Sequence, residues 1–155
     1  MSENEQNEES TDYNAFNRKL IEEFRANGGQ VSGMFAGSPL LLLTTTGAKS
    51  GQPRVAPLVY STDNGRLVVI ASKGGAPTHP DWFYNLRANP EVTVEIGTET
   101  FPARATIPEG AERQRLFDQM AAQMPGFAEY QRNTTRQLPV IVLERADQAS
   151  RSSAG

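Results

Sequence analysis

Two lysine-bearing glycine turns are the segments of this sequence best suited to hold an anionic ligand. The first, residues 44–54, reads TTTGAKSGQPR and follows an apolar run. Glycines permit positive φ angles, so successive backbone amides can converge on an anion, while Lys49 and Arg54 add charge and Ser50 adds a hydroxyl donor. A Walker phosphate-binding loop has glycine directly before its lysine, whereas Ala48 stands there in this chain. The residues alone allow either a phosphate-binding loop or a solvated hairpin turn.

The second turn, residues 71–75, reads ASKGG and follows another predicted strand. Small residues at the end of a strand let a flat ring approach the backbone closely, and Lys73 offers a further contact to an anion. An ordinary flexible loop is the alternative interpretation. Two such turns after strands that can be neighbours favour one joint site over two separate ones.

Aromatic and amide side chains near these turns are candidate pocket residues. Trp82 and Asn85 share one face of a predicted helix, where Trp82 either stacks on a ring or fills the core, and Asn85 needs a polar partner. His79 precedes a proline in the turn before that helix and is interpreted as structural. Phe127 and Tyr130 are three residues apart and share a helical face, which either packs on the sheet or forms a lid.

The composition excludes several kinds of chemistry. The chain has 155 residues with no cysteine and one histidine, which removes disulfides, thiolate metal sites, iron–sulfur clusters and most histidine-built metal sites. We therefore predict no metal site. Redox or acid–base chemistry must come from a bound cofactor or from serine, tyrosine, lysine, arginine and carboxylate side chains.

Charge and hydropathy predict one folded domain, residues 13–145, between two solvated tails. Residues 1–12 carry five acidic and no basic side chains, so the rest of the chain has 15 basic and 13 acidic residues. This segment and residues 146–155 are too polar to offset the entropy cost of ordering. The mildly basic body lacks the clustered charge of a nucleic-acid binder. The longest apolar run, residues 40–43, is too short to span a membrane, and no signal peptide is evident, which predicts a cytoplasmic protein.

Hydrophobic periodicity predicts six strands, with a hairpin at Asn64-Gly65 between the second and the third. The strands are residues 40–46, 54–61, 66–72, 92–96, 100–106 and 138–143. The predicted helices are residues 13–27, a helix that Thr78 caps and Pro90 ends, residues 109–124 and a short helix after Gly126.

The order of these elements shows no β-α alternation, which disfavours a Rossmann domain. It favours a mainly β fold, a small antiparallel barrel with peripheral helices. The first helix either caps the barrel or lies weakly on a membrane surface, an option that Glu22 and Glu23 disfavour.

Three segments resemble the deazaflavin-dependent nitroreductase family: LLTTTGAKSGQPRVAPLVY, VIASKGGAPTHPDWFYNLRANPEVTVEI and LPVIVLER. They occur in the family's order, from about residue 40 to residue 145. The resemblance implies a split β-barrel and the use of reduced coenzyme F420, a deazaflavin that carries a phosphodiester and an oligoglutamate tail. A mildly basic groove suits such a cofactor.

The resemblance also implies residue roles. Lys49, Ser50 and the amide of Ala48 match the loop around the cofactor phosphate, and Arg54 matches a phosphate or tail-carboxylate ligand. The strand that lies along the deazaflavin ring is matched by Val55, Ala56 and Pro57. The opposite wall, whose backbone hydrogen-bonds the polar edge of the ring, is matched by Ala71, Ser72, Lys73 and Gly74. The helix that closes the pocket is matched at Trp82 and Asn85.

The implied reaction is hydride transfer to an electron-poor acceptor, such as an activated alkene, a conjugated lactone, a nitroaromatic or a quinone. Ser72 would donate a hydrogen bond to the acceptor oxygen. Phe127 and Tyr130 are the candidate acceptor-binding residues, and Tyr130 is the candidate proton donor, with water as the alternative. Members that reduce nitroimidazoles carry several tyrosines where this chain has Met124, Phe127 and Tyr130, so the acceptor stays open.

Two rival functions keep a related fold. One is an FMN-binding split-barrel oxidoreductase, and the other is a non-catalytic deazaflavin-binding protein. By analogy with other split barrels, which pair to cover an exposed sheet edge, we also expect a homodimer.

Overall fold

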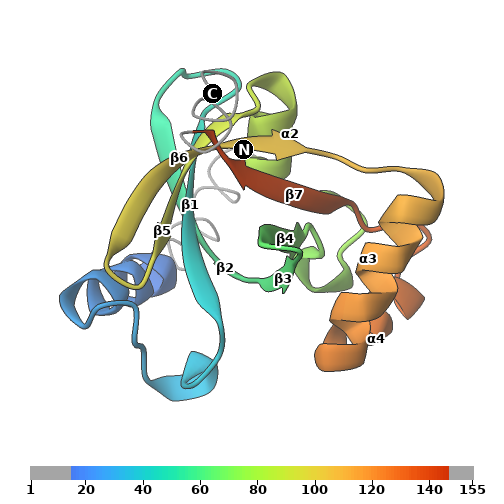
Figure 1. Cartoon of the computed structure of the whole chain (residues 1–155), viewed down its shortest axis with the longest axis horizontal. Coiled ribbons are helices and arrows are strands. Elements are labelled where there is room, and N and C mark those ends of the chain that lie inside the picture. The colour runs from blue at the N-terminus through green and yellow to red at the C-terminus, as the bar shows by residue number, and fades with distance from the viewer. Residues whose placement is uncertain (1–14, 147–155) are drawn as a thin grey trace, which may run out of the picture.

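Seven antiparallel strands form a single curled sheet (Figure 1) in the computed structural model, which describes residues 15–146. The strands are β1 (Leu40–Thr46), β2 (Pro53–Val59), β3 (Ser61–Asp63), β4 (Arg66–Ile70), β5 (Glu91–Ile96), β6 (Glu99–Thr106) and β7 (Val140–Arg145). Their order across the sheet is β2-β1-β5-β6-β7-β4-β3, so β2 and β3 are the two open edges. The expected mainly β, split-barrel fold is confirmed.

Within residues 15–146, four helices and two single 3-10 turns accompany the sheet. They are the N-terminal helix (residues 15–26), η1 (Gly33–Phe35), η2 (Lys73–Gly75), α2 (Asp81–Ala88), α3 (Gly110–Gln123) and α4 (Gly126–Arg132). The prediction for the start of α2 was wrong in one detail. Pro80 precedes the helix, and Thr78 accepts a hydrogen bond from Nζ of Lys73 at 3.2 Å.

Some predictions fall outside the described residues. These are the N-terminal tail, residues 1–12, all of the C-terminal tail except residue 146, and the first two residues of the predicted helix 13–27. None of the helices within residues 15–146 combines the length and the apolar character needed to cross a bilayer.

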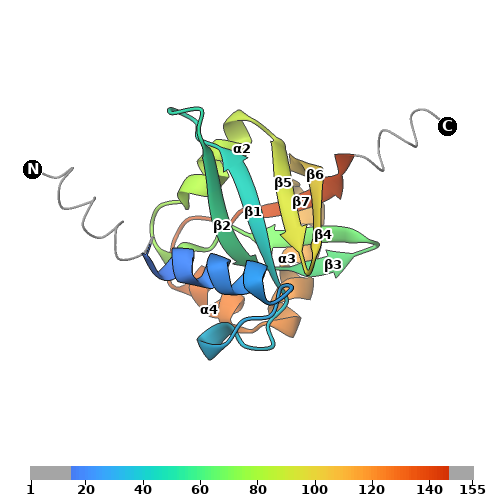
Figure 2. The same cartoon turned by 90° about the vertical axis from the view of Figure 1, so that its left-hand side faces the viewer.

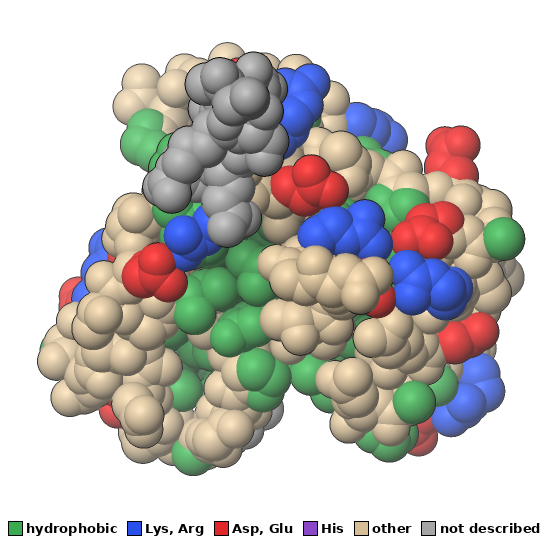
Figure 3. Space-filling view, viewed as in Figure 1, with side chains coloured by type: hydrophobic (Ala, Val, Ile, Leu, Met, Phe, Trp, Pro, Cys, Tyr) green, Lys and Arg blue, Asp and Glu red, His purple; other side chains and the backbone are tan. Residues whose placement is uncertain are grey.

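Alternating side chains of each strand separate an inner core from two outer layers. Leu41 and Leu43 of β1 face into the curled sheet and pack in the same core cluster as Phe83 of α2. Leu40 and Leu42 pack instead under the N-terminal helix, which lies across β1 and β2 (Figure 2). The outward residues of β4 and β7 pack against α3. Between the β1–β2 side and the α3–α4 side, hydrophobic side chains are visible in a hollow (Figure 3).

The first four strands form two hairpins: β1–β2, an alternative that the first glycine turn left open, and β3–β4 around Asn64-Gly65. β2 pairs with β1 over the full length of both strands. The strand is interrupted at Tyr60, whose amide donates to the carbonyl of Pro39 at 3.0 Å. The short β3 follows and pairs with β4. Asn64 and Gly65 take the positive φ angles of the tight turn, 51° and 80°. The predicted turn is confirmed, but its first strand was wrong because β2 finds its partner in β1.

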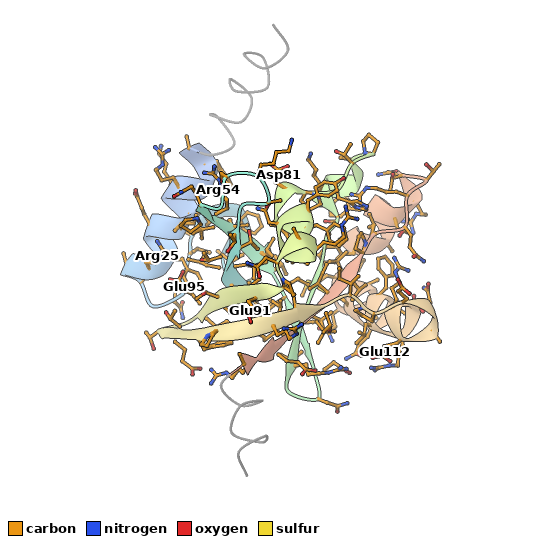
Figure 4. All side chains as sticks on the ribbon, turned by 90° about the horizontal axis from the view of Figure 1, so that it is seen from above. Arg25, Arg54, Asp81, Glu91, Glu95 and Glu112 are labelled. Atoms are coloured by element: carbon orange, nitrogen blue, oxygen red, sulfur yellow. The ribbon has the colours of Figure 1, made fainter. Side chains whose placement is uncertain are left out.

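Ion pairs link helices to a central strand and to one edge of the sheet. Arg25 of the N-terminal helix faces Glu95 of β5 (Figure 4), with Nη2 2.8 Å from Oε2. The Asp63 carboxylate, 8% exposed, accepts hydrogen bonds from Arg115 of α3 and Arg66 of β4. The bonds from Arg115 have the largest effect and those from Arg66 the next largest, and together they lower the pKa of Asp63 to about 2. The edge hairpin β3–β4 is thereby tied to α3.

Candidate functional site

The first glycine turn is the loop that joins β1 to β2. The amide of Gly47 donates to the carbonyl of Gln52 at 2.8 Å, which ties the ends of the loop together. The amide of Gln52 donates to Oγ of Ser50 at 3.1 Å, so the Ser50 hydroxyl keeps its own hydrogen for an acceptor. A Cβ at Gly47 would lie 2.5 Å from Oγ of Ser50. A larger residue at this position would therefore force the Ser50 side chain to move.

Positive charge and hydrogen-bond donors gather at this loop. Lys49 and Arg54 are exposed, and neither forms an ion pair with another residue in the described part of the chain. The amides of Lys49 and Ser50 donate to no other described residue. Arg54 pairs with Thr45 across the sheet, which puts it on the face that α2 covers, and Figure 4 shows it on the same side of the molecule as Asp81 at the start of α2. This donor set suits an anion such as a phosphate.

Asn85 fastens the first loop to α2, and its side chain is 8% exposed. Its Oδ1 accepts a hydrogen bond from the amide of Ala48 at 2.9 Å, and its Nδ2 donates to Oγ1 of Thr45 at 3.1 Å. The polar partner of Asn85 is therefore the loop. The Ala48 amide, which the resemblance places at the cofactor phosphate, is engaged by Asn85 in this structure, so Lys49 and Ser50 supply the remaining amide donors.

The second turn joins β4 to α2 through η2. Ala71 is fully buried in the inner core, Ser72 is half-buried, and Lys73 is exposed. Lys73 has a φ of 47°, which is uncommon for a residue with a Cβ. Gly74 is the middle residue of η2. The turn thus presents short side chains and backbone next to the start of α2.

Arg136, between α4 and β7, holds the second turn in place. Its guanidinium donates to the carbonyl oxygens of Ala71, Ser72 and Ala76 at 3.2, 2.7 and 2.7 Å. Its Nη1 also lies 2.8 Å from Nδ1 of His79, which accepts a hydrogen bond there when the imidazole is neutral. Burial, followed by the neighbouring guanidinium charges, lowers the pKa of His79 below its ordinary value. These contacts agree with a structural His79.

Helix α2 links the two turns, although their strands are not neighbours. β5, β6 and β7 separate β1 from β4 in the sheet, which contradicts the expectation of adjacent strands. The second turn leads into α2, and Asn85 of α2 binds the first loop. Trp82, three residues before Asn85, is half-buried against the inner core. The helix therefore connects the two turns, which the sheet order alone would keep apart.

The β2 residues assigned to the ring do not share one face. Ala56 lies opposite Leu43 and faces the inner side of the sheet. Val55 packs under the N-terminal helix, and Pro57 lies on that same outer side, opposite Leu42. Along this edge strand, a ring on the inner side would meet the side chain of Ala56 and backbone.

Helix α4 lies directly against the second turn. A Cβ at Gly75 would come within 2.9 Å of the carbonyl oxygen of Tyr130, so glycine lets the two backbones meet this closely. The rings of Phe127 and Tyr130 meet edge to face, with centroids 6.0 Å apart. Phe127 packs against the core under α3, whereas Tyr130 is 37% exposed. The backbone of Tyr130 therefore lies against the turn that carries Ser72, and the residue is partly accessible.

Two cavities lie away from these residues. One, of about 280 Å³, lies between the N-terminal helix and η1, and the other, of about 210 Å³, lies beside Gly97. Neither is lined by a residue of the two turns, of α2 or of α4. Across residues 15–146, no three His, Cys, Asp or Glu side chains gather where they could hold a metal ion.

Sequence reasoning included Thr45 in the first turn but missed its buried bond to Asn85, and it missed Arg136 altogether. The alternation of Leu41 and Leu43 along β1 would have placed Thr45 on the inner face, where a hydroxyl needs a partner. No local pattern around Arg136 indicates that it reaches a turn about 60 residues earlier in the chain.

Comparison with known proteins finds close relatives. Residues 16–145 match the model of a family described as F420H(2)-dependent quinone reductase. The F420H(2)-dependent quinone reductase of Mycobacterium tuberculosis is 37% identical over 128 residues, which are 79% of this chain and 85% of that protein. A solved F420-H2 dependent reductase is 44% identical with a TM-score of 0.63, over 68% of this chain and 94% of that chain. A solved domain-swapped dimer is 39% identical with a TM-score of 0.66, over 87% and 99% of the two chains.

The family match spans both turns, α2 and α4, and it confirms the expected enzyme class and cofactor, an oxidoreductase that uses reduced coenzyme F420. The family name differs from the resemblance, because the matching family is named for quinone reduction rather than nitro reduction. This chain belongs to the F420H(2)-dependent quinone reductase family.

Proposed function

We propose that this protein binds reduced coenzyme F420 between the first loop and the second turn and reduces a quinone there. The family description and the M. tuberculosis relative support this acceptor class. The observation that carries the proposal is the pair of hydrogen bonds made by Asn85. They join a cationic loop suited to a phosphate to the helix that begins beside a turn suited to a ring.

The residues of the first loop fit the phosphate and the acidic tail of the cofactor. Lys49 and Arg54 offer exposed charge, and Ser50 offers a hydroxyl hydrogen. Hydrogen bonds to a charged group contribute about 1.5–3 kcal/mol each. In this proposal Lys49 and Ser50 hold the phosphate, while Arg54 binds the phosphate or a tail carboxylate. The Ala48 amide supports the loop through Asn85 instead of contacting the phosphate.

When bound, the reduced deazaflavin supplies a hydride, so the protein must orient the ring, exclude water and stabilise developing charge. We place the ring between β2 and the second turn. Val55, Ala56 and Pro57 would form one wall, mainly through Ala56 and the backbone. Ala71, Ser72, Lys73 and Gly74 would form the other, and Trp82 and Asn85 would close the pocket.

Ser72 and Tyr130 are the groups that we place at the acceptor. Reduction of a quinone to a hydroquinone adds a hydride and a proton, and negative charge develops on a quinone oxygen between the two additions. The Ser72 hydroxyl would donate to that oxygen. Tyr130 or water would deliver the proton, and the Phe127 ring would provide apolar contact. Nitroaromatics, activated alkenes and conjugated lactones are further acceptors that the same hydride chemistry admits.

A homodimer is part of the proposal. The solved relative described as a domain-swapped dimer supports it, as do the open edge strands β2 and β3 and the hydrophobic hollow (Figure 3). A cytoplasmic location stays a prediction from the sequence.

The test is titration with F420 followed by steady-state turnover. F420H2 oxidation would be measured against a naphthoquinone, a benzoquinone, a nitroaromatic and a conjugated lactone, with Lys49→Ala as the binding control. We expect saturable F420 binding and fastest turnover with a quinone. Binding without turnover of any acceptor would favour the non-catalytic alternative. Tighter binding of FMN than of F420 would favour the flavoprotein, against which the F420-dependent relatives already speak.

A further inference from the structure

The guanidinium of Arg136 donates four hydrogen bonds to neutral acceptors. Three go to the carbonyls of Ala71, Ser72 and Ala76, and one goes to Nδ1 of His79. A guanidinium has five N–H groups, so this set uses most of them. Among residues 15–146, Arg136 forms no ion pair within 4.0 Å. Its positive charge is therefore not cancelled locally.

The backbone of the segment that carries Arg136 is held by side chains of α3 and α4. Arg113 of α3, which is 5% exposed, donates to the carbonyl of Leu138 at 2.6 Å. Gln131 of α4 accepts from the amide of Leu138 at 2.9 Å and donates to the carbonyl of Arg136 at 2.8 Å. The backbone beneath the guanidinium is thus anchored to two helices, which makes Arg136 a rigid support for the second turn.

The hydrogen bond from Arg136 to the carbonyl of Ser72 also helps to fix the direction of the next amide. The carbonyl of Ser72 and the amide of Lys73 belong to one planar trans peptide, so the two groups point in opposite directions. The carbonyl accepts hydrogen bonds from Arg136 at 2.7 Å and from the amide of Gly75 at 2.9 Å, whereas the Lys73 amide points away from the carbonyl and donates to no other described residue. A cation bound to the carbonyl also polarises the peptide, which strengthens its N–H as a donor.

We propose that Arg136 is a positioning residue for hydride transfer, because it aims and polarises the Lys73 amide toward the bound ring and keeps positive charge behind Ser72. This inference rests on the proposed function. Preorganised dipoles and a fixed cation stabilise negative charge without having to reorganise during the reaction. Removing Arg136 therefore slows the transfer step more than it weakens cofactor binding, which depends largely on the first loop.

The first test uses the protein without cofactor. The chain has a single histidine, so in an untagged protein the imidazole proton signals in NMR belong to His79 alone. Arg136, Arg87 and the Tyr84 ring surround His79. Arg136→Met removes a charge, so the pKa of His79 should rise toward its ordinary value. Arg132→Met, which changes an exposed arginine of α4, should leave that pKa unchanged.

The second test compares the rate of hydride transfer with F420 affinity. At saturating F420H2 and naphthoquinone, the single-turnover rate of Arg136→Met should fall about 10²-fold, the size of the loss when one charge-stabilising donor is removed. The Kd for F420 should change by less than about fivefold. Arg136→Lys keeps the charge but loses the planar fork, so its rate should lie between those of wild type and Arg136→Met. Arg132→Met should match wild type.

Three outcomes would overturn the inference. They are a rate for folded Arg136→Met within about threefold of wild type, a Kd that rises as much as the rate falls, and an Arg136→Lys rate no higher than that of Arg136→Met. If Arg136→Met does not fold, Arg136→Lys decides, and a rate equal to wild type refutes the inference. A wild-type protein that neither binds F420 nor turns over quinone would instead refute the proposed function itself.

Discussion

The amide nitrogen of Ala48 lies 2.9 Å from Oδ1 of Asn85 and donates a hydrogen bond to it. This bond joins the loop after β1 to the helix that follows β4, although three strands separate β1 from β4 in the sheet. In the proposed complex it connects the phosphate end of the cofactor to the ring end. A change at Asn85 should therefore disturb both ends.

Asn85→Leu should lower both stability and cofactor affinity. The substitution leaves the buried Thr45 hydroxyl without its hydrogen-bond partner, which costs about 1–3 kcal/mol of folding free energy. It also removes the hydrogen bond that holds the first loop. We expect the Kd for F420 to rise about fivefold or more, the equivalent of one lost neutral hydrogen bond. Thr45→Val is the matched control, because it removes the buried hydroxyl and keeps the bond to Ala48. Calorimetry with F420 should show near-normal affinity for Thr45→Val, and normal affinity for Asn85→Leu would argue against the role of Asn85.

Lys49→Ala should weaken F420 binding by about 1.5–3 kcal/mol, or about 10- to 150-fold in Kd, the range for a hydrogen bond to a charged group. Because Lys49 is exposed, added salt should shrink the difference from wild type. Lys19→Ala, which changes an exposed lysine of the N-terminal helix, serves as the control. Equal affinities of Lys49→Ala and wild type at low salt would mean that the phosphate binds elsewhere.

Tyr130→Phe should reduce turnover less than about tenfold and leave F420 affinity unchanged. A positioned general acid contributes about 10²–10⁴-fold, but Tyr130 is 37% exposed, and a hydroquinone anion can take its proton from water. Steady-state comparison with one quinone measures the effect. A thousandfold loss at unchanged Kd would instead identify Tyr130 as the proton donor.

Asp63→Asn should lower the melting temperature at pH 7 and make the melting temperature less dependent on pH in the acid range. The pKa of Asp63 is about 2 in the folded protein against an ordinary 3.8, so the ionised carboxylate stabilises the fold above pH 4. That stabilisation is lost as the pH falls from 4 to 2. Melting curves across this range should fall less steeply for Asp63→Asn than for wild type and for the exposed-site control Asp118→Asn. Parallel curves for Asp63→Asn and wild type would show that the network with Arg66 and Arg115 does not stabilise the fold.

Local signals predicted most of the fold. The alternation around Gly97 gave β5 and β6, and the Asn64-Gly65 pair gave a tight turn. The pairing of β2 could not be read in the same way, because a glycine-rich turn such as residues 44–54 is compatible with a ligand-binding loop as well as with a hairpin. Its strand partner depends on a tertiary choice between β1 and β4, and no residue in β2 encodes that choice locally.

The candidate site was predicted in its parts and not in its connections. Glycine, lysine and serine in two turns indicated an anion site, whereas the bond from Ala48 to Asn85 and the clamp by Arg136 span 37 to 65 residues of sequence. Such contacts depend on how the sheet curls. They therefore became visible only when the fold was known.

The central claim is that the two turns together hold F420H2 and pass its hydride to a quinone. Single-turnover mixing of the protein with F420H2 and a naphthoquinone tests it directly, with a second sample of F420H2 that carries deuterium at the carbon that donates the hydride. We predict a rate far above the uncatalysed reaction, one hydroquinone formed per F420H2 oxidised, and a slower transfer of deuterium. A protein that binds F420H2 with normal affinity but leaves the rate at the uncatalysed level would contradict the claim.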